Sequence, residues 1–356
     1  MAETEDLPEE IIVNILTWLP VKSLIRFTSV SKRLRFIILS DPKFAESQLK
    51  AARQQKTLSR RLLVSTINAP PLELESIHLD DTPSFGEPSS VRKLSLPFHQ
   101  QPVRFVKLLG SCNGLVFVAF DEKLFYIWNP SVRFFKQLPD PPGFSSFFSV
   151  TFSGVGCVSA TDDYKVLVAS VWKTEVWMFS SRARVWKSIQ VAGYSPALYA
   201  TGHGILLNEA LHWVEDEFDH EILVFDLLRE EFRKMRLPNF QRRLGFLPAL
   251  LGVSFGGCLC VCRRPITACD SADFWVMREY DVRGGDSWTK LLNLKLSDPP
   301  QGPIMVMESS IIAQRWTSDG SCLVDIDHKK EEKLGVILGN SLKMIPYEES
   351  LLRISV

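Results

Sequence analysis

Tyr126-Ile127-Trp128-Asn129, with Phe135-Lys136 beginning six residues after Asn129, is the stretch that decides how most of this chain folds. Its aromatic and β-branched residues favour a β-strand, and its polar residue marks a turn. The aromatic residue and the base then begin a second strand. We therefore predict a β-hairpin that is one unit of an all-β region.

The same unit recurs further along the chain. With the polar residue of each unit as its anchor, successive anchors are 51, 46, 55 and 44 residues apart. Such spacings match single four-stranded blades of a β-propeller, in which each blade covers the faces of its neighbours. The copies are Val176-Trp177-Met178-Phe179-Ser180 with Trp186-Lys187, Leu223-Val224-Phe225-Asp226 with Phe232-Arg233, a looser one from Glu279-Tyr280-Asp281 to Trp288, and a weak one at Leu323-Val324-Asp325.

The number of blades follows from the length of this region. About 295 residues at roughly 50 per blade predict about six blades. The sixth blade would come from residues 62–110 or from strands shared between the two ends of the chain. A pair of β-sandwiches is the structural alternative.

Residues 7–50 have helical periodicity instead. Pro8-Glu9-Glu10 suits the first turn of a helix, and Pro20 ends it. A second helix is expected over residues 24–38 and a third after Ser40-Asp41-Pro42. Three short helices cannot bury all their apolar side chains, so some are expected to contact a partner; a helical cap on the next domain is the alternative. The apolar stripe of the first helix is Ile11, Ile12, Ile15, Leu16 and Leu19.

This segment resembles the F-box of plant F-box proteins over residues 5–50. The matching words include Leu7-Pro8-Glu9-Glu10-Ile11-Ile12, Leu19-Pro20-Val21-Lys22-Ser23-Leu24 and Ser40-Asp41-Pro42-Lys43-Phe44. Ser31 and Leu34 depart from the family, which often has Cys and Trp there. The resemblance implies a surface that docks a Skp-type adaptor, and through it a cullin–RING ligase. The adaptor-binding residues that it implies are Leu7, Pro8, Ile11, Ile15, Leu16, Leu19, Pro20 and Leu24.

Residues 105–340 resemble a second family, the F-box-associated, kelch-like domain of plants. The words that carry the resemblance are Gly110-Ser111-Cys112-Asn113-Gly114-Leu115, Trp128-Asn129-Pro130-Ser131, Asp162-Asp163-Tyr164-Lys165-Val166 and Ala210-Leu211-His212-Trp213. Glu209 stands where the family usually has Gly. The resemblance implies a propeller that binds a target protein, with no fixed contact residues.

The expected fold is therefore an α+β multidomain protein: a short three-helix F-box followed by an all-β, kelch-like propeller. We place the F-box at residues 1–55 and the propeller at 105–345. Residues 56–104, which are rich in proline, form a poorly defined linker or the first blade.

Charge and cysteine content exclude several classes of protein. The 41 basic and 41 acidic residues cancel, which favours neither nucleic acid nor a membrane surface as partner. Cys258, Cys260 and Cys262 alternate like residues of a strand, and this spacing favours buried free thiols over a zinc site. The acidic N-terminus is unlike a signal peptide, so we expect a location in the cytoplasm, the nucleus or both. The uncharged run 244–262 could span a membrane, but its glycines favour two strands.

No catalytic, cofactor or metal motif is found, and the six histidines occur singly. His212 is interpreted as a structural residue of a strand. The chain is thus predicted to be a non-catalytic substrate receptor of a Skp–cullin–F-box ubiquitin ligase. The alternatives are a propeller enzyme with a helical cap and a regulatory binding protein that does not promote degradation. The target is unidentified, and the expected target-binding residues are Phe240, Arg242, Arg243 and Phe246.

Overall fold

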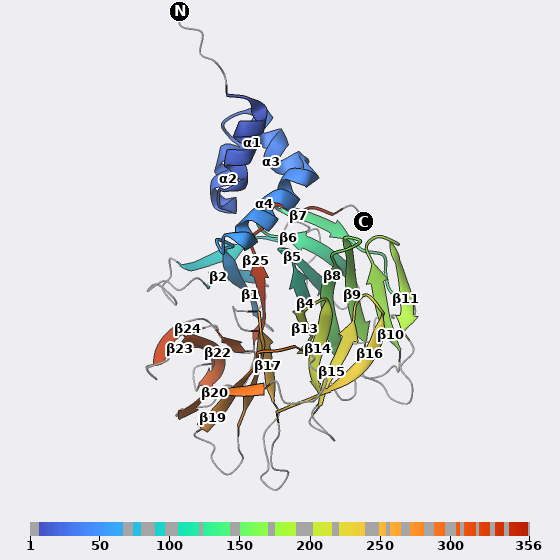
Figure 1. Ribbon diagram of the computed structural model, residues 1–356, viewed down its shortest axis with the longest axis vertical. Coiled ribbons are helices and arrows are strands. Elements are labelled where there is room, and N and C mark those ends of the chain that lie inside the picture. Colours follow the sequence, from blue (N-terminus) through green and yellow to red (C-terminus); the bar gives the residue numbers. More distant parts are fainter. Residues whose placement is uncertain are drawn as a thin grey trace, which may run out of the picture.

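The chain folds into a helical module followed by a ring of β-sheets (Figure 1). The computed structural model describes residues 7–66, 74–79, 90–96, 106–120, 124–142, 150–169, 175–189, 202–215, 221–238, 249–253, 257–264, 271–280, 288–295, 304–306, 310–317, 320–327, 332–337 and 342–354. We call residues 7–55 the helical module and the described residues from 60 onward the ring.

The helical module contains four helices, so the expectation of three helices is wrong. They are α1 (Glu9–Thr17), α2 (Val21–Phe27), α3 (Lys32–Ser40) and α4 (Pro42–Gln54). The stretch expected as one helix is divided because the Ser31 side chain accepts a hydrogen bond from the Leu34 amide and begins α3. The Asp41 side chain accepts one from the Lys43 amide and begins α4 in the same way.

The described strands form six sheets. Every neighbouring pair is antiparallel except β12 with β8, which is parallel. In hydrogen-bonding order, sheet 1 is β25 (Leu342–Glu348), β1 (Arg60–Thr66), β2 (Leu74–His78) and β3 (Val91–Leu94); sheet 2 is β4 (Val106–Cys112), β5 (Leu115–Phe120), β6 (Leu124–Asn129) and β7 (Phe134–Gln137); sheet 3 is β11 (Val185–Ile189), β10 (Val176–Ser180), β9 (Asp163–Ala169), β8 (Phe152–Val158) and β12 (Gly202–His203). Sheet 4 is β13 (Ile205–Leu207), β14 (Ala210–Glu215), β15 (Glu221–Asp226) and β16 (Glu231–Arg236); sheet 5 is β17 (Leu250–Val253), β18 (Leu259–Arg263), β19 (Ser271–Met277) and β20 (Trp288–Lys295); sheet 6 is β21 (Ile304–Val306), β22 (Ser310–Thr317), β23 (Gly320–Asp327) and β24 (Glu332–Ile337).

Sheet 1 closes the ring by combining strands from distant parts of the sequence. Strand β25 pairs with β1, with Leu62 opposite Pro346 and Val64 opposite Met344. Residues 60–94 therefore contribute three strands, and the C-terminal region contributes the innermost one. The two predicted sources of the sixth blade were residues 62–110 and strands shared between the two ends of the chain. Both contribute strands to this sheet.

The recurring sequence unit is a hairpin with a capped turn. The side chains of Asn129, Ser180 and Asp226 accept hydrogen bonds from backbone amides of their own turns, from Ser131, Ala183 and Leu228. In each hairpin the aromatic residue six positions later lies opposite the aromatic residue that precedes the cap. These cross-strand pairs are Trp128 with Phe135, Phe179 with Trp186, and Phe225 with Phe232.

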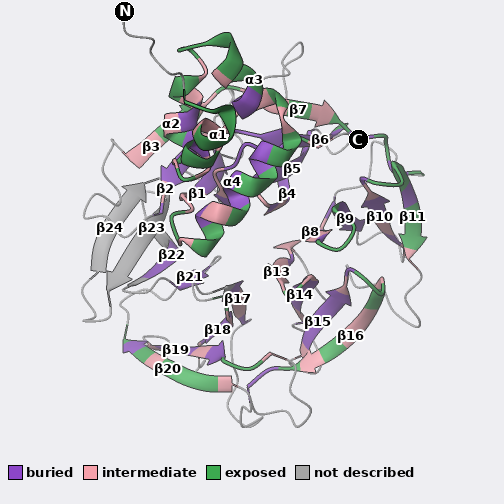
Figure 2. Cartoon of the chain, turned by 45° about the horizontal axis from the view of Figure 1, so that its top comes forward, coloured by how far each residue is buried: buried purple, intermediate pink, exposed green. Residues whose placement is uncertain are grey.

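Apolar side chains fill the spaces between neighbouring sheets. Figure 2 shows the buried residues of these strands in purple. The described part of the chain contains no helix that is long and apolar enough to cross a membrane. Within the run 244–262, Leu250–Val253 and Leu259–Arg263 pair as antiparallel strands. The expectation of two strands there is confirmed. Cys260 and Cys262 are buried free thiols, and Cys258 is half-buried.

Candidate functional site

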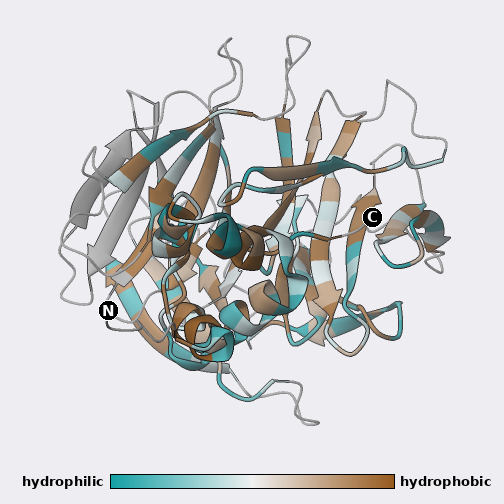
Figure 3. Ribbon diagram, turned by 90° about the horizontal axis from the view of Figure 1, so that it is seen from above, coloured by the Kyte–Doolittle hydropathy of each residue, from teal (hydrophilic) through white to brown (hydrophobic). Residues whose placement is uncertain are grey.

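The helical module presents a row of large apolar side chains to solvent. Leu7, Ile11 and Ile15 are exposed, and Trp18 beyond the end of α1 is 60% exposed. Ile11, Ile15 and Trp18 are spaced by four and three residues, which places them on one face of α1, and Leu7 lies just before the helix begins. Figure 3 shows this module from above, with brown apolar residues and teal polar residues along its coils. Phe27, Val30 and Phe36 of the following helices and turns are exposed as well.

The opposite face of α1 forms the interior of the module. Leu16 is 5% exposed and Leu24 is fully buried, and both belong to one apolar core with Ile37, Ile38 and Phe44. Of the predicted adaptor-binding residues, Leu7, Pro8, Ile11, Ile15 and Pro20 are therefore exposed, Leu19 is half-buried, and Leu16 and Leu24 lie inside. Trp18 and Phe36 were not among the predicted residues, although Trp18 continues the spacing of Ile11 and Ile15.

Helix α4 attaches the module to the ring. The Arg53 guanidinium donates to Glu348 Oε2 at 2.7 Å and to Asn113 Oδ1 at 2.8 Å. The amide of Asn113 then donates to the Tyr164 hydroxyl at 3.0 Å. Arg53 thus connects the helix to sheets 1 and 2, and through Asn113 to sheet 3. Glu348 raises the pKa of Arg53 despite its partial burial, so the guanidinium stays charged.

The segment after β25 adds an apolar component to this attachment. Leu351 and Leu352 are buried in the same core as Phe44 and Leu49 of the helices. The fully buried Asn129 amide donates to the backbone carbonyls of Ser350 and Leu352, at 3.1 and 2.9 Å. A side chain at Gly114, where φ is +80°, would collide with Ser350. The module and the ring therefore share one continuous core.

A cavity of about 1410 Å³ lies inside the ring and reaches α4, with Arg53, Cys112, Tyr164 and His203 among its lining residues. The thiols of Cys112 and Cys157 in its lining are poor nucleophiles. Burial raises the pKa of the Cys112 thiol well above its ordinary value, and raises that of Cys157 to about 12. The described residues include no cluster of three or more His, Cys, Asp or Glu side chains that could hold a metal ion.

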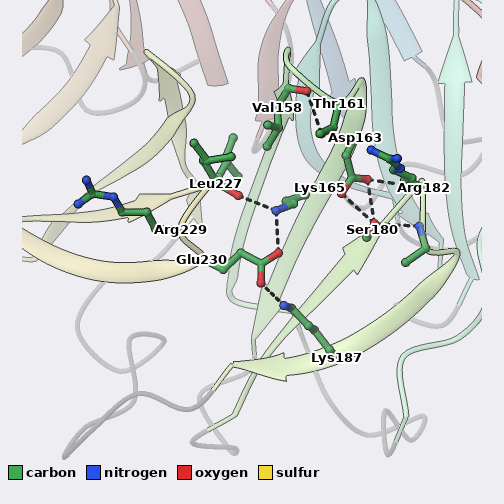
Figure 4. A network of polar contacts seen from close by, with 12 residues as sticks. Val158, Thr161, Asp163, Lys165, Ser180, Arg182, Lys187, Leu227, Arg229 and Glu230 are labelled. Atoms are coloured by element: carbon green, nitrogen blue, oxygen red, sulfur yellow. Dashed lines mark hydrogen bonds and ion pairs between the residues drawn. The ribbon is translucent and has the colours of Figure 1, made fainter.

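A charged network joins sheets 3 and 4 (Figure 4). The buried Lys165 donates to the Leu227 carbonyl at 2.6 Å and to Glu230 Oε1 at 2.7 Å. Lys187, the base of the second sequence unit, binds the other oxygen of Glu230. Burial alone would raise the pKa of Glu230, but the two lysines lower it. Lys187, which follows the aromatic Trp186 in its sequence unit, therefore helps to connect sheet 3 to sheet 4.

The predicted target-binding residues Phe240, Arg242, Arg243 and Phe246 lie outside the described residues. The strand ends that flank them can be placed. Asn113 contacts α4, so the turn between β4 and β5 faces the helices, and strands alternate in direction within each sheet. Strand β16 consequently ends, and β17 begins, on the face opposite the helices, as Figure 1 shows.

Two family models match the chain. Residues 5–46 match the F-box domain, and residues 71–350 match the F-box associated beta propeller domain. The chain belongs to the F-box-associated β-propeller family. The F-box match lies in the helical module, and the propeller match lies in the ring. Proteins of this family with an F-box are typically non-catalytic adaptors. The family model that matches the ring describes a β-propeller and does not identify kelch repeats.

Similar curated proteins support the same family. This F-box protein is 30% identical to F-box protein CPR1 of Arabidopsis thaliana over 81% of its own length and 73% of that protein. It is 29% identical to an F-box/kelch-repeat protein of the same plant, over 90% of this chain and 85% of the relative. Among solved structures, a chain of a nidogen/laminin complex matches 82% of this chain and 99% of that chain with a TM-score of 0.54. At 11% identity this last likeness shows the fold alone.

Proposed function

We propose that this F-box protein is the substrate receptor of a Skp–cullin–F-box ubiquitin ligase that marks a target protein for degradation. The observation that carries the proposal is the exposed apolar row Leu7, Ile11, Ile15 and Trp18 on a module that the family model identifies as an F-box. Side chains of this size stabilise a protein interface when they leave water there, whereas in the isolated chain they stay exposed and add little to its stability.

The attachment of the module suits a receptor that works by proximity. Ubiquitin transfer requires the target lysine to be held near the ubiquitin carrier, and a fixed geometry favours that encounter. Arg53 and the shared core with Leu351 and Leu352 hold the F-box against the ring. The chain supplies position, and the covalent chemistry belongs to other subunits.

We place the target on the face of the ring opposite the helices. The loops singled out in the sequence, around residues 215–220, 239–246 and 263–274, connect strand ends on that face. A rigid ring with variable loops at one end is a common arrangement for recognition. A target bound there leaves the helical face free for the adaptor.

The test is binding of a purified Skp-type adaptor to the full chain. The double variant Ile11→Glu/Ile15→Glu places two carboxylates in the docking face at exposed positions, so we expect binding to be lost and the unfolding midpoint to be unchanged. Leu291→Glu, an exposed apolar position on β20, is the matched control and should bind normally. Normal adaptor binding by the double variant would exclude the proposal. Recovery of a cullin with the wild-type complex, and not with the variant, extends the test to the ligase.

A further inference from the structure

Three neighbouring sheets present the same pair of exposed side chains on the helix side of the ring. Each of their outer hairpins places an exposed arginine within two residues of one large exposed apolar residue. The arginines are Arg133, Arg184 and Arg229. The turn of sheet 3 has a second exposed arginine, Arg182. The apolar residues are Phe135, Val185 and Leu228, which are 41%, 57% and 63% exposed. They account for three of the five exposed large apolar side chains among the described residues of the ring.

The three turns are adjacent around the ring. Trp186 of sheet 3 donates to the Pro139 carbonyl that follows sheet 2, and Lys165 of sheet 3 reaches Glu230 of sheet 4. The arginines and apolar side chains therefore form one band, the rim, along the outer edge of sheets 2, 3 and 4. Its net positive charge is local, because the whole chain carries equal numbers of basic and acidic residues.

The backbone shows that folding alone does not explain two of these arginines. Arg133 and Arg184 have φ angles of 54° and 61°, in the left-handed region that favours glycine or asparagine. Glu230 holds the equivalent position in sheet 4 with φ 59°, and there the side chain binds two lysines. No carboxylate pairs with Arg133 or Arg184 within the described part of the chain. Strained positions with exposed functional groups are often recognition sites.

We propose that the rim binds an extended acidic segment of a partner protein, with apolar residues between its carboxylates. Arginine binds carboxylates through two parallel hydrogen bonds, and a central apolar contact beside it is typical of interface anchors. Arginines and apolar side chains alternate along the three sheets. An extended peptide can present carboxylates and apolar side chains in the same alternation. Nucleic acid fits less well, because Val185 and Leu228 cannot stack on bases as aromatic side chains do. This inference does not depend on adaptor binding, which is measured separately.

In Figure 4, Arg229 points away from the network of Lys165, Glu230 and Lys187, so the third arginine is also available to a partner. Glu231 at the start of β16 is an exposed acid beside it. We therefore expect Arg133 and Arg184 to contribute most of the binding.

The probe is a fluorescein-labelled peptide of repeated Glu-Glu-Leu, titrated with the full chain and followed by fluorescence anisotropy. Arg133→Glu/Arg184→Glu should weaken binding by about tenfold or more, because like charges then face each other across the interface. The control is Arg92→Glu/Lys295→Glu, which makes the same charge change on the exposed strands β3 and β20 and should bind normally. Equal loss in the control, or no loss in the rim variant, would overturn the proposal.

A glycine variant separates recognition from folding. Arg133→Gly/Arg184→Gly relieves the left-handed backbone, so the unfolding midpoint should stay equal or rise while binding of the probe weakens. A lower midpoint would show that the arginines support the fold and would argue against the proposal. Tighter binding of a single-stranded oligonucleotide than of the peptide, or no binding of the peptide at millimolar concentration, would also overturn it.

Discussion

The helical module exposes many of its large apolar side chains, whereas the ring buries most of its own. Of the twelve exposed large apolar side chains among the described residues, seven belong to the helical module, which is the much smaller part. The ring buries its strands between neighbouring sheets, so its core is complete within the chain. The difference predicts that the ring folds without the helices, although both share the core around Leu351 and Leu352, whereas the module keeps apolar surface for a partner.

The largest effect is expected from Leu16→Glu, which places a carboxylate in the interior of the module. Burial of an unpaired carboxylate at this position should destabilise the module by about 3 kcal/mol or more. Adaptor binding should be lost while the ring stays folded. Hydrogen exchange can check this, since the amides of α1–α4 should lose protection and those of β4–β6 should keep it. Protection of the helices in this variant would contradict the division between the two faces of α1.

Removal of the whole module should have a smaller effect on the ring. We expect residues 59–356 to unfold cooperatively, because the sheets bury one another. The free energy of unfolding should fall by about 2–3 kcal/mol, because Phe44 and Leu49 no longer cover Leu351 and Leu352. Differential scanning calorimetry on the fragment and the full chain measures both. Absence of a cooperative transition would show that the ring depends on the helices.

The smallest effect concerns one contact inside the ring. Glu230→Gln should destabilise the chain by about 1–2 kcal/mol at neutral pH, because it removes charge from the contacts with Lys165 and Lys187. Since the pKa of Glu230 is lowered on folding, its contribution exists above the ordinary glutamate pKa and is lost as pH falls through the lower, folded value. The difference between variant and wild type should therefore vanish in acid.

Thermal unfolding at a series of pH values checks this prediction, with the exposed neighbour Glu231→Gln as the control. A constant difference across the acid range would mean that the charge of Glu230 is not what stabilises the contact.

The sequence was sufficient for the recurring hairpins and for the F-box, and less so for the surface of the module. Aromatic residues and turn caps are local signals, and the first three copies stand where the structure has a capped hairpin. The weak fifth copy was wrong, because its anchor Asp325 lies inside β23 opposite Lys333, and the fourth anchor lies outside the described residues. Which face of α1 points outward cannot be predicted from the residues of α1 alone. Ile11 and Ile12 are equally apolar, and only the packing of α4 against one side of α1 decides between them.

Two further features depend on contacts between distant residues. The break between α2 and α3 rests on one serine cap, Ser31, in a stretch whose apolar spacing continues through it. The attachment of Arg53 to Glu348 joins residues nearly three hundred positions apart. A sequence pattern within a short stretch of residues gives no information about contacts between residues far apart in the chain.

The pairing of β1 with β25 has a consequence for how the protein is made. A ribosome releases the helices and β1 first, and β25 only after every other described strand. During synthesis the helices can fold while sheet 1 still lacks its innermost strand, and the slow, long-range closure of the ring comes last. An adaptor could therefore engage the nascent chain before the propeller is able to hold a target.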